Sequence, residues 1–226
     1  MTVLPNQKEK ILGIVYVLAQ YSLVPSLLTY MNGSLSRPLS DGQLNFCFFL
    51  LNFLFTVLIF RRFLKDSLAP LKENFKQSLL IVLMGFLLGT LSQALVGALI
   101  RHLLPDFLNH NDQSIGAMAR GDFLLTAMGT VLLVPPAEEC IHRGLIFGGL
   151  HDKYPRSAYL SSAAIFASIH VLGYLGTYSG LQLAAAFSQY LLPGLILAWS
   201  YEKTNTIYVP IVIHALINLK GMLLLL

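Results

Sequence analysis

The sequence predicts an all-α fold, a polytopic membrane helix bundle of about seven transmembrane helices with a polar intramembrane cavity. Composition is the first reason, since 55% of the 226 residues are hydrophobic and only 12% are charged, about half the charged share of an ordinary soluble domain. The mean hydropathy is +0.67. The other reasons are a series of charge-free apolar runs and a group of charged residues inside one of them. This pattern excludes a soluble globular enzyme, a disordered protein and a disulfide scaffold.

Seven segments can form the membrane helices, because a bilayer core about 30 Å thick needs roughly 20 apolar residues of helix. The first carries no charge, the second ends at Arg61 and Arg62, and the third has small residues that favour close helix contact. The fourth is apolar only in its first half. The fifth is short for a full crossing, and a glycine-rich turn at 173–180 separates it from the sixth. The predicted spans are residues 11–31, 43–60, 77–100, 122–150, 158–172, a sixth that ends at 201, and 206–226, and the small residues are Gly85, Gly89, Ser92 and Gly97.

The distribution of basic residues predicts the orientation of these spans. Ten basic residues fall on one side of the predicted bundle and three on the other. Because positively charged loops stay in the cytoplasm, we expect a cytoplasmic N-terminus and, with an odd number of spans, a C-terminus outside. The net charge of +4 then reflects the topology of a multi-pass cell-membrane protein and indicates no nucleic-acid partner. The ten are Lys8, Lys10, Arg61, Arg62, Lys65, Lys72, Lys76, Lys153, Arg156 and Lys203, and the three are Arg37, Arg101 and Arg120.

The fourth predicted span contains charged residues where charge is costly. Each charged side chain at mid-membrane opposes insertion by about 2.5 to 3.5 kcal/mol unless it is paired or hydrated. Glu139 and Arg143 are four residues apart, so they share a helix face and can form an ion pair. Glu138 lies on another face and is left freer. Pro135 and Pro136 are expected to interrupt the preceding turn and to admit water to the carboxylates.

Two later spans each carry a histidine within an apolar run. Phe166 and His170 share one face of the fifth span, and His214 and Asn218 share one face of the seventh. In a bundle these groups can converge with the glutamates on one buried polar cavity. Each histidine or asparagine taken alone is also compatible with an ordinary interhelical hydrogen bond.

Three motifs carry a family resemblance. Glu138 to Arg143 match E-E-x-x-x-R, Phe166 to His170 match F-x-x-x-H, and His214 to Asn218 match H-x-x-x-N. In this order, on apolar helices, they resemble the CAAX prenyl endopeptidase and bacteriocin-processing family, also called the Abi family. The family often has an aromatic residue just before the arginine, where this chain has His142. We expect one integral membrane domain over residues 1–226, with a motif-bearing peptidase core at about 122–222.

The resemblance implies an intramembrane glutamate-type endopeptidase. Carried over by position, Glu138 would be the general base that activates a water, with His170 helping to hold that water. His214 and Asn218 would form the oxyanion hole, and Glu139, Arg143 and Phe166 would shape the site or bind substrate. Amide hydrolysis needs a base and donors aimed at the oxyanion, and these residue types supply both. The expected substrate is a hydrophobic or lipid-associated peptide, as in bacteriocin or pheromone maturation or self-immunity.

Two alternatives belong to other classes. A non-catalytic immunity or scaffold protein would use the polar cluster for structure or for binding a peptide. A zinc peptidase would use Glu138, His142, His170 and His214 as ligands and Glu139 as the base, although H-E-x-x-H is absent and Arg143 would add an unfavourable positive charge. We expect no cofactor, contact with membrane lipid and no nucleic acid. The pattern leaves the oligomeric state open.

Overall fold

The computed structural model describes residues 3–225, which form helices and loops without a β-strand. The all-α prediction is therefore confirmed for this part of the chain. Two helical segments have π-helical hydrogen bonding, labelled η1 and η2, and η3 is a short 3₁₀ turn. In chain order the elements are α1 (Gln7–Tyr21), α2 (Leu23–Gly33), α3 (Asp41–Ile59), α4 (Arg61–Asp66), α5 (Leu68–Glu73), α6 (Phe75–Leu103), α7 (His110–Gly121), α8 (Phe123–Met128), η1 (Gly129–Leu133), α9 (Val134–Glu139), η2 (Cys140–Phe147), α10 (Gly148–His151), α11 (Pro155–Ile169), η3 (Leu172–Tyr174), α12 (Gly180–Thr204) and α13 (Tyr208–Leu223).

The predicted count of seven spans is not confirmed. Four helices of the described chain are long and apolar enough to cross a membrane, namely α3, α6, α12 and the continuous helix Phe123–His151. The pair α1 and α2 makes a fifth only if it is counted as one bent span. Helices α11 and α13 have 15 and 16 residues. At 1.5 Å per residue each extends only about 22 to 24 Å, less than the bilayer core of about 30 Å.

The bend between α1 and α2 has a local cause. The two helices meet at 44° around Ser22, whose φ and ψ of −128° and −62° are not helical. Pro25 lies in the first turn of α2 and has no N–H to donate to the carbonyl of Tyr21, four residues earlier. The helix therefore breaks where a proline removes the hydrogen bond that would continue it.

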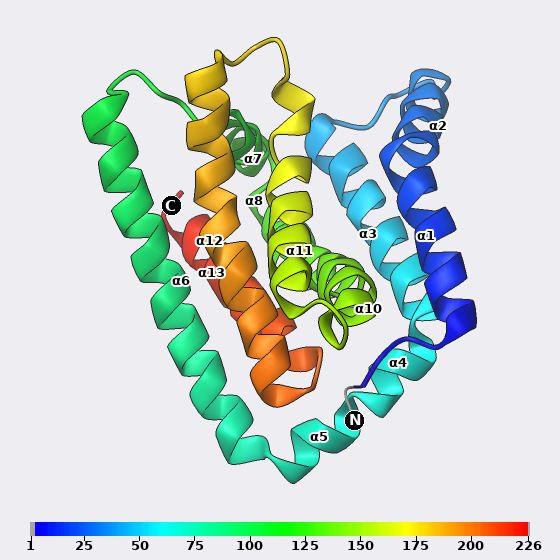
Figure 1. Cartoon of the computed structure of the whole chain (residues 1–226). Helices are drawn as coiled ribbons and strands as arrows, with labels where there is room; N and C mark the ends of the chain where they lie inside the picture. Colours follow the sequence, from blue (N-terminus) through cyan, green and yellow to red (C-terminus); the bar gives the residue numbers. More distant parts are fainter. Residues whose placement is uncertain (1–2, 226) are drawn as a thin grey trace.

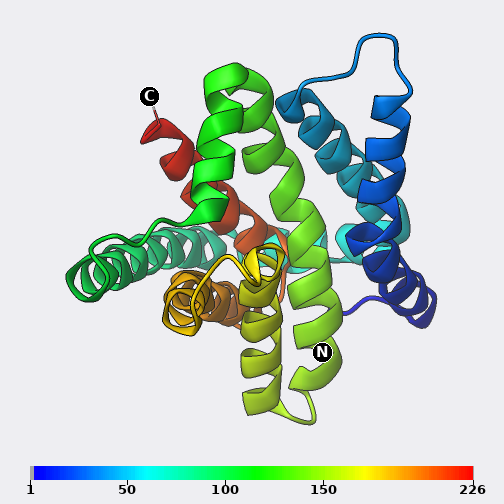
Figure 2. The same ribbon diagram turned by 90° about the horizontal axis from the view of Figure 1, so that it is seen from above.

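The helices form a bundle around α11 and the helix that runs from α8 to α10 (Figure 1). Helices α1 to α3 lie on one side, and α6 lies at the opposite edge, where it packs against α12 and α13. The short helices α4 and α5 run along one end and join α3 to α6 (Figure 1). Seen from above, α7 and α8 lie at one side of the bundle, near the C-terminal part of α13 (Figure 2).

The chain connections alternate between the two ends of this bundle. The start of α1, the α4–α5 segment, the α10–α11 turn and the α12–α13 turn lie at one end, and the α2–α3, α6–α7 and α11–α12 connections lie at the other (Figure 1). The segments that carry the ten basic residues thus share one end. Which end faces the cytoplasm stays a prediction from charge.

Helix α6 approaches α13 closely because two of its residues have no side chain. A Cβ added at Gly89 would lie 2.7 Å from Cδ1 of Ile217, and one added at Gly85 would clash with Ile213. These two contacts confirm the prediction of close helix contact for half of the small residues in the third span. Ser92 instead donates to the carbonyl of Gly89, within its own helix. This close packing fixes α13, and with it His214, relative to the rest of the bundle.

Candidate active site

The helix with both glutamates is continuous, in contrast to the predicted interruption at Pro135 and Pro136. Gly129–Leu133 and Cys140–Phe147 adopt π-helical hydrogen bonding, and α9 lies between them. The wider turns of a π-helix tolerate two prolines, which have no N–H to donate. The hydrogen-bonding pattern therefore changes around α9, but the helix is not interrupted. Such π-helical turns occur frequently at functional sites. Glu138 and Glu139 are the last two residues of α9, and Arg143 lies in η2.

Glu139 and Arg143 form the predicted ion pair. Arg143 Nη1 lies 2.9 Å from Glu139 Oε1, and both side chains are 0% exposed. The same carboxylate oxygen lies 2.8 Å from Nδ1 of His214 on α13. A buried charge is tolerated only when it is paired and hydrogen-bonded, and Arg143 and His214 supply these partners to Glu139. Oε1 of Glu139 is thus bound by two donors from different parts of the chain, whereas its Oε2 is buried and has no hydrogen-bond partner among the described residues.

Arg143 also connects this network to α11 and α12. Its Nη2 donates to the carbonyl of Gly194, 2.9 Å away, and its guanidinium carbon lies 4.7 Å from the centre of the Phe166 ring. A Cβ at Gly194 would lie 3.1 Å from the backbone Cα of Ala163. The glycine therefore allows α12 to approach α11 more closely than a residue with a Cβ would without a shift of the backbone. Arg143, Phe166 and Gly194 hold three helical segments together around the carboxylates.

Glu138 differs sharply from its neighbour. Its side chain is 17% exposed and its Oε2 lies 3.9 Å from His214 Nε2, too far for a direct hydrogen bond. Oε2 is buried and accepts no hydrogen bond from the residues that the structure describes. A water can bridge two polar groups that are separated by more than 3.5 Å, so a water or a substrate oxygen beside these two atoms could contact both.

The hydrogen bonds of His214 and His170 assign the proton-bearing nitrogen of each ring. His214 Nδ1 faces the Glu139 carboxylate at 2.8 Å and His170 Nδ1 faces the carbonyl of Phe166 at 2.8 Å. A carbonyl or carboxylate oxygen accepts, so both Nδ1 atoms donate, and Nε2 is the nitrogen left for chemistry. In the neutral ring Nε2 is an acceptor, and in the doubly protonated ring it is a donor.

His170 follows the last residue of α11, and its ring packs between two aromatic rings. The Phe166 ring lies 4.8 Å away at 51°, and the Tyr190 ring stacks on it at 4.3 Å and 21°. Phe166 also contacts His214, at 5.7 Å in an edge-to-face arrangement. Phe166 therefore lies between the two predicted catalytic histidines and brings them to the same site.

Asn218 lies one turn beyond His214 on α13 and points to the helix that carries the glutamates. Its Nδ2 donates to the carbonyl of Thr130 in η1 at 2.8 Å. This bond uses one of two N–H groups and leaves the other available. The described residues show no direct contact between Asn218 and either glutamate.

His142, the histidine within the first motif, binds a backbone carbonyl and packs against an aromatic ring. His142 Nδ1 donates to the carbonyl of Glu138 at 2.8 Å, and its ring meets Phe166 edge to face at 5.3 Å. Within residues 3–225, no group of three or more His, Cys, Asp or Glu side chains is arranged to hold a metal ion.

Three contacts of the site were missed from the sequence. Gly194 and Thr130 contribute backbone carbonyls, which no side-chain motif reveals. The one signal in the sequence is Pro193 beside Gly194, because a proline inside a helix indicates irregular backbone hydrogen bonding. Tyr190 stacks on His170 from a helix whose sequence gives no signal of that contact.

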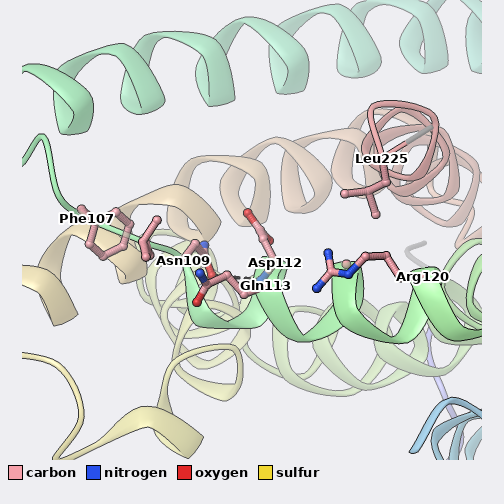
Figure 3. Close-up of a pocket in the computed structure, with 8 residues that line it drawn as sticks. Phe107, Asn109, Asp112, Gln113, Arg120 and Leu225 are labelled. Carbon is pink, nitrogen blue, oxygen red and sulfur yellow. Dashed lines mark hydrogen bonds between the residues drawn. The ribbon is translucent and has the colours of Figure 1, made fainter.

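A pocket of about 410 Å³ lies beside α7, on the side of the site where Tyr190 is found. Figure 3 shows Asp112 and Arg120 of α7 directed toward the pocket, with Leu225 near Arg120. Asp112 connects it to the site, because its Oδ1 lies 3.3 Å from the hydroxyl of Tyr190. The lining residues are Phe107, Leu108, Asn109, Asp112, Gln113, Gly116, Arg120 and Leu225.

Fold and site together define a multi-pass α-helical membrane protein with a buried cluster of glutamate, histidine and arginine. Residues 120–220 match the family model described as type II CAAX prenyl endopeptidase Rce1-like. This region contains all three motifs, so the resemblance that they predicted is confirmed for this part of the chain.

Two curated relatives are similar to the chain. "UPF0177 protein YxdF" of Lactococcus lactis subsp. lactis (strain IL1403) is 34% identical over 94 residues, which cover 40% of this chain and 44% of that protein. "Putative membrane peptidase YdiL" of Bacillus subtilis (strain 168) is 28% identical over 166 residues, 72% of this chain and 63% of that protein. The chain thus spans less than two thirds of the length of either relative. No solved structure matches it significantly.

Proposed function

We propose that this protein is an intramembrane endopeptidase that hydrolyses a peptide bond in a hydrophobic or lipid-associated peptide by means of a water activated by Glu138. The single observation that carries the proposal is the contrast between the two adjacent glutamates. Glu139 is fully buried and bound by Arg143 and His214. Glu138 is 17% exposed and its Oε2 has no hydrogen-bond partner among the described residues. Oε2 of Glu139 also lacks a partner, but that side chain is 0% exposed and its other oxygen is held by two donors. The similarity to a family and a relative named for peptidase activity supports the same proposal.

The proposed chemistry assigns a step to each group. The carboxylate of Glu138 removes a proton from water while the water oxygen attacks the carbonyl carbon of the substrate. His170 Nε2, the free nitrogen of that ring, accepts the second hydrogen of the water and orients it. The remaining N–H of Asn218 and the protonated Nε2 of His214 donate to the oxyanion that forms. Glu138 then transfers its proton to the leaving amine, and the C–N bond breaks.

The proposed roles of Glu139, Arg143 and Phe166 are to support this site. Glu139 accepts from His214 Nδ1 and thereby orients Nε2 of that ring toward Glu138. Arg143 balances the charge of Glu139, and Phe166 packs against both histidines. We further propose that the reaction needs no metal, because the guanidinium of Arg143 would repel a cation bound beside Glu139. The setting that we propose, bacterial peptide maturation or self-immunity, agrees with the bacterial source of both relatives.

The test compares Glu138→Gln with the wild type in detergent or nanodiscs. The substrates are synthetic hydrophobic peptides, with and without a farnesylated cysteine four residues from the carboxyl end, and cleavage is followed by mass spectrometry. Glu73→Gln is the matched control, since Glu73 is exposed in α5. We expect cleavage by the wild type and by the control, and a loss of about 10² to 10⁴-fold in Glu138→Gln, the usual contribution of a general base.

Two outcomes would contradict the proposal. One is cleavage by Glu138→Gln at the wild-type rate, and the other is no cleavage of any peptide by the wild type. A retained immunity phenotype in cells that produce Glu138→Gln would instead support the non-catalytic alternative.

A further inference from the structure

Tyr190 contacts a histidine of the site with its ring and a surface helix with its hydroxyl. The ring stacks on His170 with centroids 4.3 Å apart and an angle of 21° between the planes. The hydroxyl lies on the side of α7, which precedes the glutamate-bearing helix and carries the polar residues of the 410 Å³ pocket. None of the three motifs includes Tyr190.

The hydroxyl of Tyr190 is held by the first turn of α7. It accepts from Nδ2 of Asn109 and from Nδ2 of Asn111, each at 3.1 Å. Its own proton can go to Oδ1 of Asp112 at 3.3 Å. Asn109 caps α7 by accepting from the backbone N–H of Asn111 at 3.0 Å, so the hydroxyl contacts the residues that define the start of this helix. Asn109 and Asp112 both line the pocket (Figure 3).

Helix α7 is also bound to the loop that follows His170. The backbone N–H of His110 donates to the hydroxyl of Tyr178 at 2.7 Å, and the two rings stack at 4.9 Å and 22°. Tyr178 in turn donates to the carbonyl of Leu108 at 3.1 Å. The start of α7 is therefore attached to two segments that follow His170 in the chain, to the loop through Tyr178 and to α12 through Tyr190.

Three contacts restrain the ring of His170. Its Nδ1 bonds to the carbonyl of Phe166, the ring of Phe166 covers part of it, and Tyr190 stacks on it. The hydrogen bond alone leaves a half-buried side chain free to tilt about its Cβ–Cγ bond. Stacking on a ring whose hydroxyl is fixed by α7 removes that freedom. A group that must orient a water loses much of its effect when it is displaced by about 1 Å.

We propose that Tyr190 is a positioning residue, which fixes the ring of His170 and connects it to the α7 wall of the pocket. This inference rests on the proposed peptidase function for its kinetic consequence, but the restraint on the ring is a property of the folded protein alone. A ligand bound in the pocket beside Asn109 and Asp112 would then change the position of the His170 ring through the side chain of Tyr190.

The test uses the full-length protein in nanodiscs with histidine labelled for NMR, and His170→Asn assigns the His170 signal. In the wild type we expect the ring protons of His170 to be shifted upfield by the stacked ring of Tyr190. Tyr190→Leu should abolish that shift and lower kcat on the peptides described above by about tenfold to a hundredfold, with KM within twofold. Tyr190→Phe keeps the ring and should keep the shift, with a kcat between those of the wild type and Tyr190→Leu and with faster hydrogen exchange in the first turn of α7.

Tyr30→Leu is the control, because Tyr30 is 75% exposed on α2. An unshifted His170 signal in the wild type would overturn the inference without any variant, and so would an unchanged kcat in Tyr190→Leu. Absence of peptide cleavage in the wild type would count against the proposed function only, because the NMR arm does not depend on activity. If the Tyr190→Leu protein does not fold, the inference is tested by the NMR shift of His170 in the wild type and by the comparison of the wild type with Tyr190→Phe.

Discussion

Nδ1 of His214 lies 2.8 Å from Oε1 of Glu139, a contact between α13 and α9 across 75 residues of sequence. The same oxygen binds Arg143 Nη1 at 2.9 Å. One carboxylate oxygen thus binds a donor from its own helical segment and a donor from the last helix. This arrangement makes Nδ1 of His214 a donor to Glu139, and it directs Nε2 of that ring to Glu138.

Loss of Arg143 is expected to destabilise the protein strongly. Arg143→Leu would leave the carboxylate of Glu139 buried with one partner fewer, and a broken buried ion pair costs about 3 to 5 kcal/mol of unfolding free energy. The measurement is unfolding in a titration with sodium dodecyl sulfate. Arg62→Leu is the control, because Arg62 pairs with Asp66 at 3.5 Å with side chains 72% and 52% exposed, and exposed pairs contribute less than about 1 kcal/mol. Equal destabilisation by the two variants would contradict the assigned role.

Local geometry made part of this site predictable. The pairs Glu139 with Arg143, Phe166 with His170 and His214 with Asn218 are each four residues apart, and helical geometry places such residues on one face. The ion pair and the ring contact follow directly. The sequence could not predict the contacts between helices, such as Tyr190 with His170, because those depend on how distant helices pack.

The predicted interruption of the helix was wrong and the predicted span count is not confirmed, and both outcomes have physical explanations. The proline pair predicted an interrupted helix. In the structure the helix is continuous, and π-helical turns on both sides of α9 accommodate two residues that have no N–H to donate. The span count was based on apolar segments of roughly 20 residues. In the structure α13 has 16 residues, fewer than its apolar segment 206–226 suggested. Helix α11 has 15 residues, as many as the predicted segment 158–172, which was already short for a full crossing.

Gly194 should tolerate no side chain. Gly194→Ala would force a Cβ to within 3.1 Å of the backbone Cα of Ala163, which cannot move aside as a side-chain tip can. Separation of α11 from α12 would displace the carbonyl that binds Arg143, and overpacking typically costs about 1 to 3 kcal/mol. We expect a lower unfolding midpoint and lower peptidase activity. Gly149→Ala is the matched control, since no atom lies within 4 Å of a Cβ placed there, and its midpoint should not fall.

The contact between α6 and α13 is expected to respond to a compensating pair of changes. Gly89→Leu would collide with Cδ1 of Ile217, which lies 2.7 Å from the position of a Cβ at residue 89. We expect a loss of about 1 to 3 kcal/mol in unfolding free energy. Ile217→Ala alone should also destabilise, but Gly89→Leu combined with Ile217→Ala should be more stable than the sum of the single changes predicts. Additive effects in this double-mutant cycle would show that the two helices do not meet at this point.

Removal of metal ions should leave peptidase activity unchanged if the proposed glutamate mechanism operates. The guanidinium of Arg143 lies against Glu139, where a divalent cation would be repelled. The measurement is the rate of peptide cleavage after dialysis against a chelator, with and without added zinc. A rate that falls on dialysis and recovers with zinc would favour the zinc alternative and would reject the metal-free mechanism.

Substitution by glutamine should change the stability of the protein differently at the two adjacent glutamates, although activity falls in both variants. Glu138→Gln removes a charge whose Oε2 has no hydrogen-bond partner among the described residues, so the unfolding free energy should stay the same or increase while activity is lost. Glu139→Gln weakens charge-assisted hydrogen bonds to Arg143 and His214, and we expect it to cost about 1.5 to 3 kcal/mol. Its activity should also fall, because His214 loses the carboxylate that orients it. Unfolding titrations and cleavage rates of both variants test this contrast, and a Glu138→Gln protein less stable than Glu139→Gln would mean that the base and the anchor have been assigned the wrong way round.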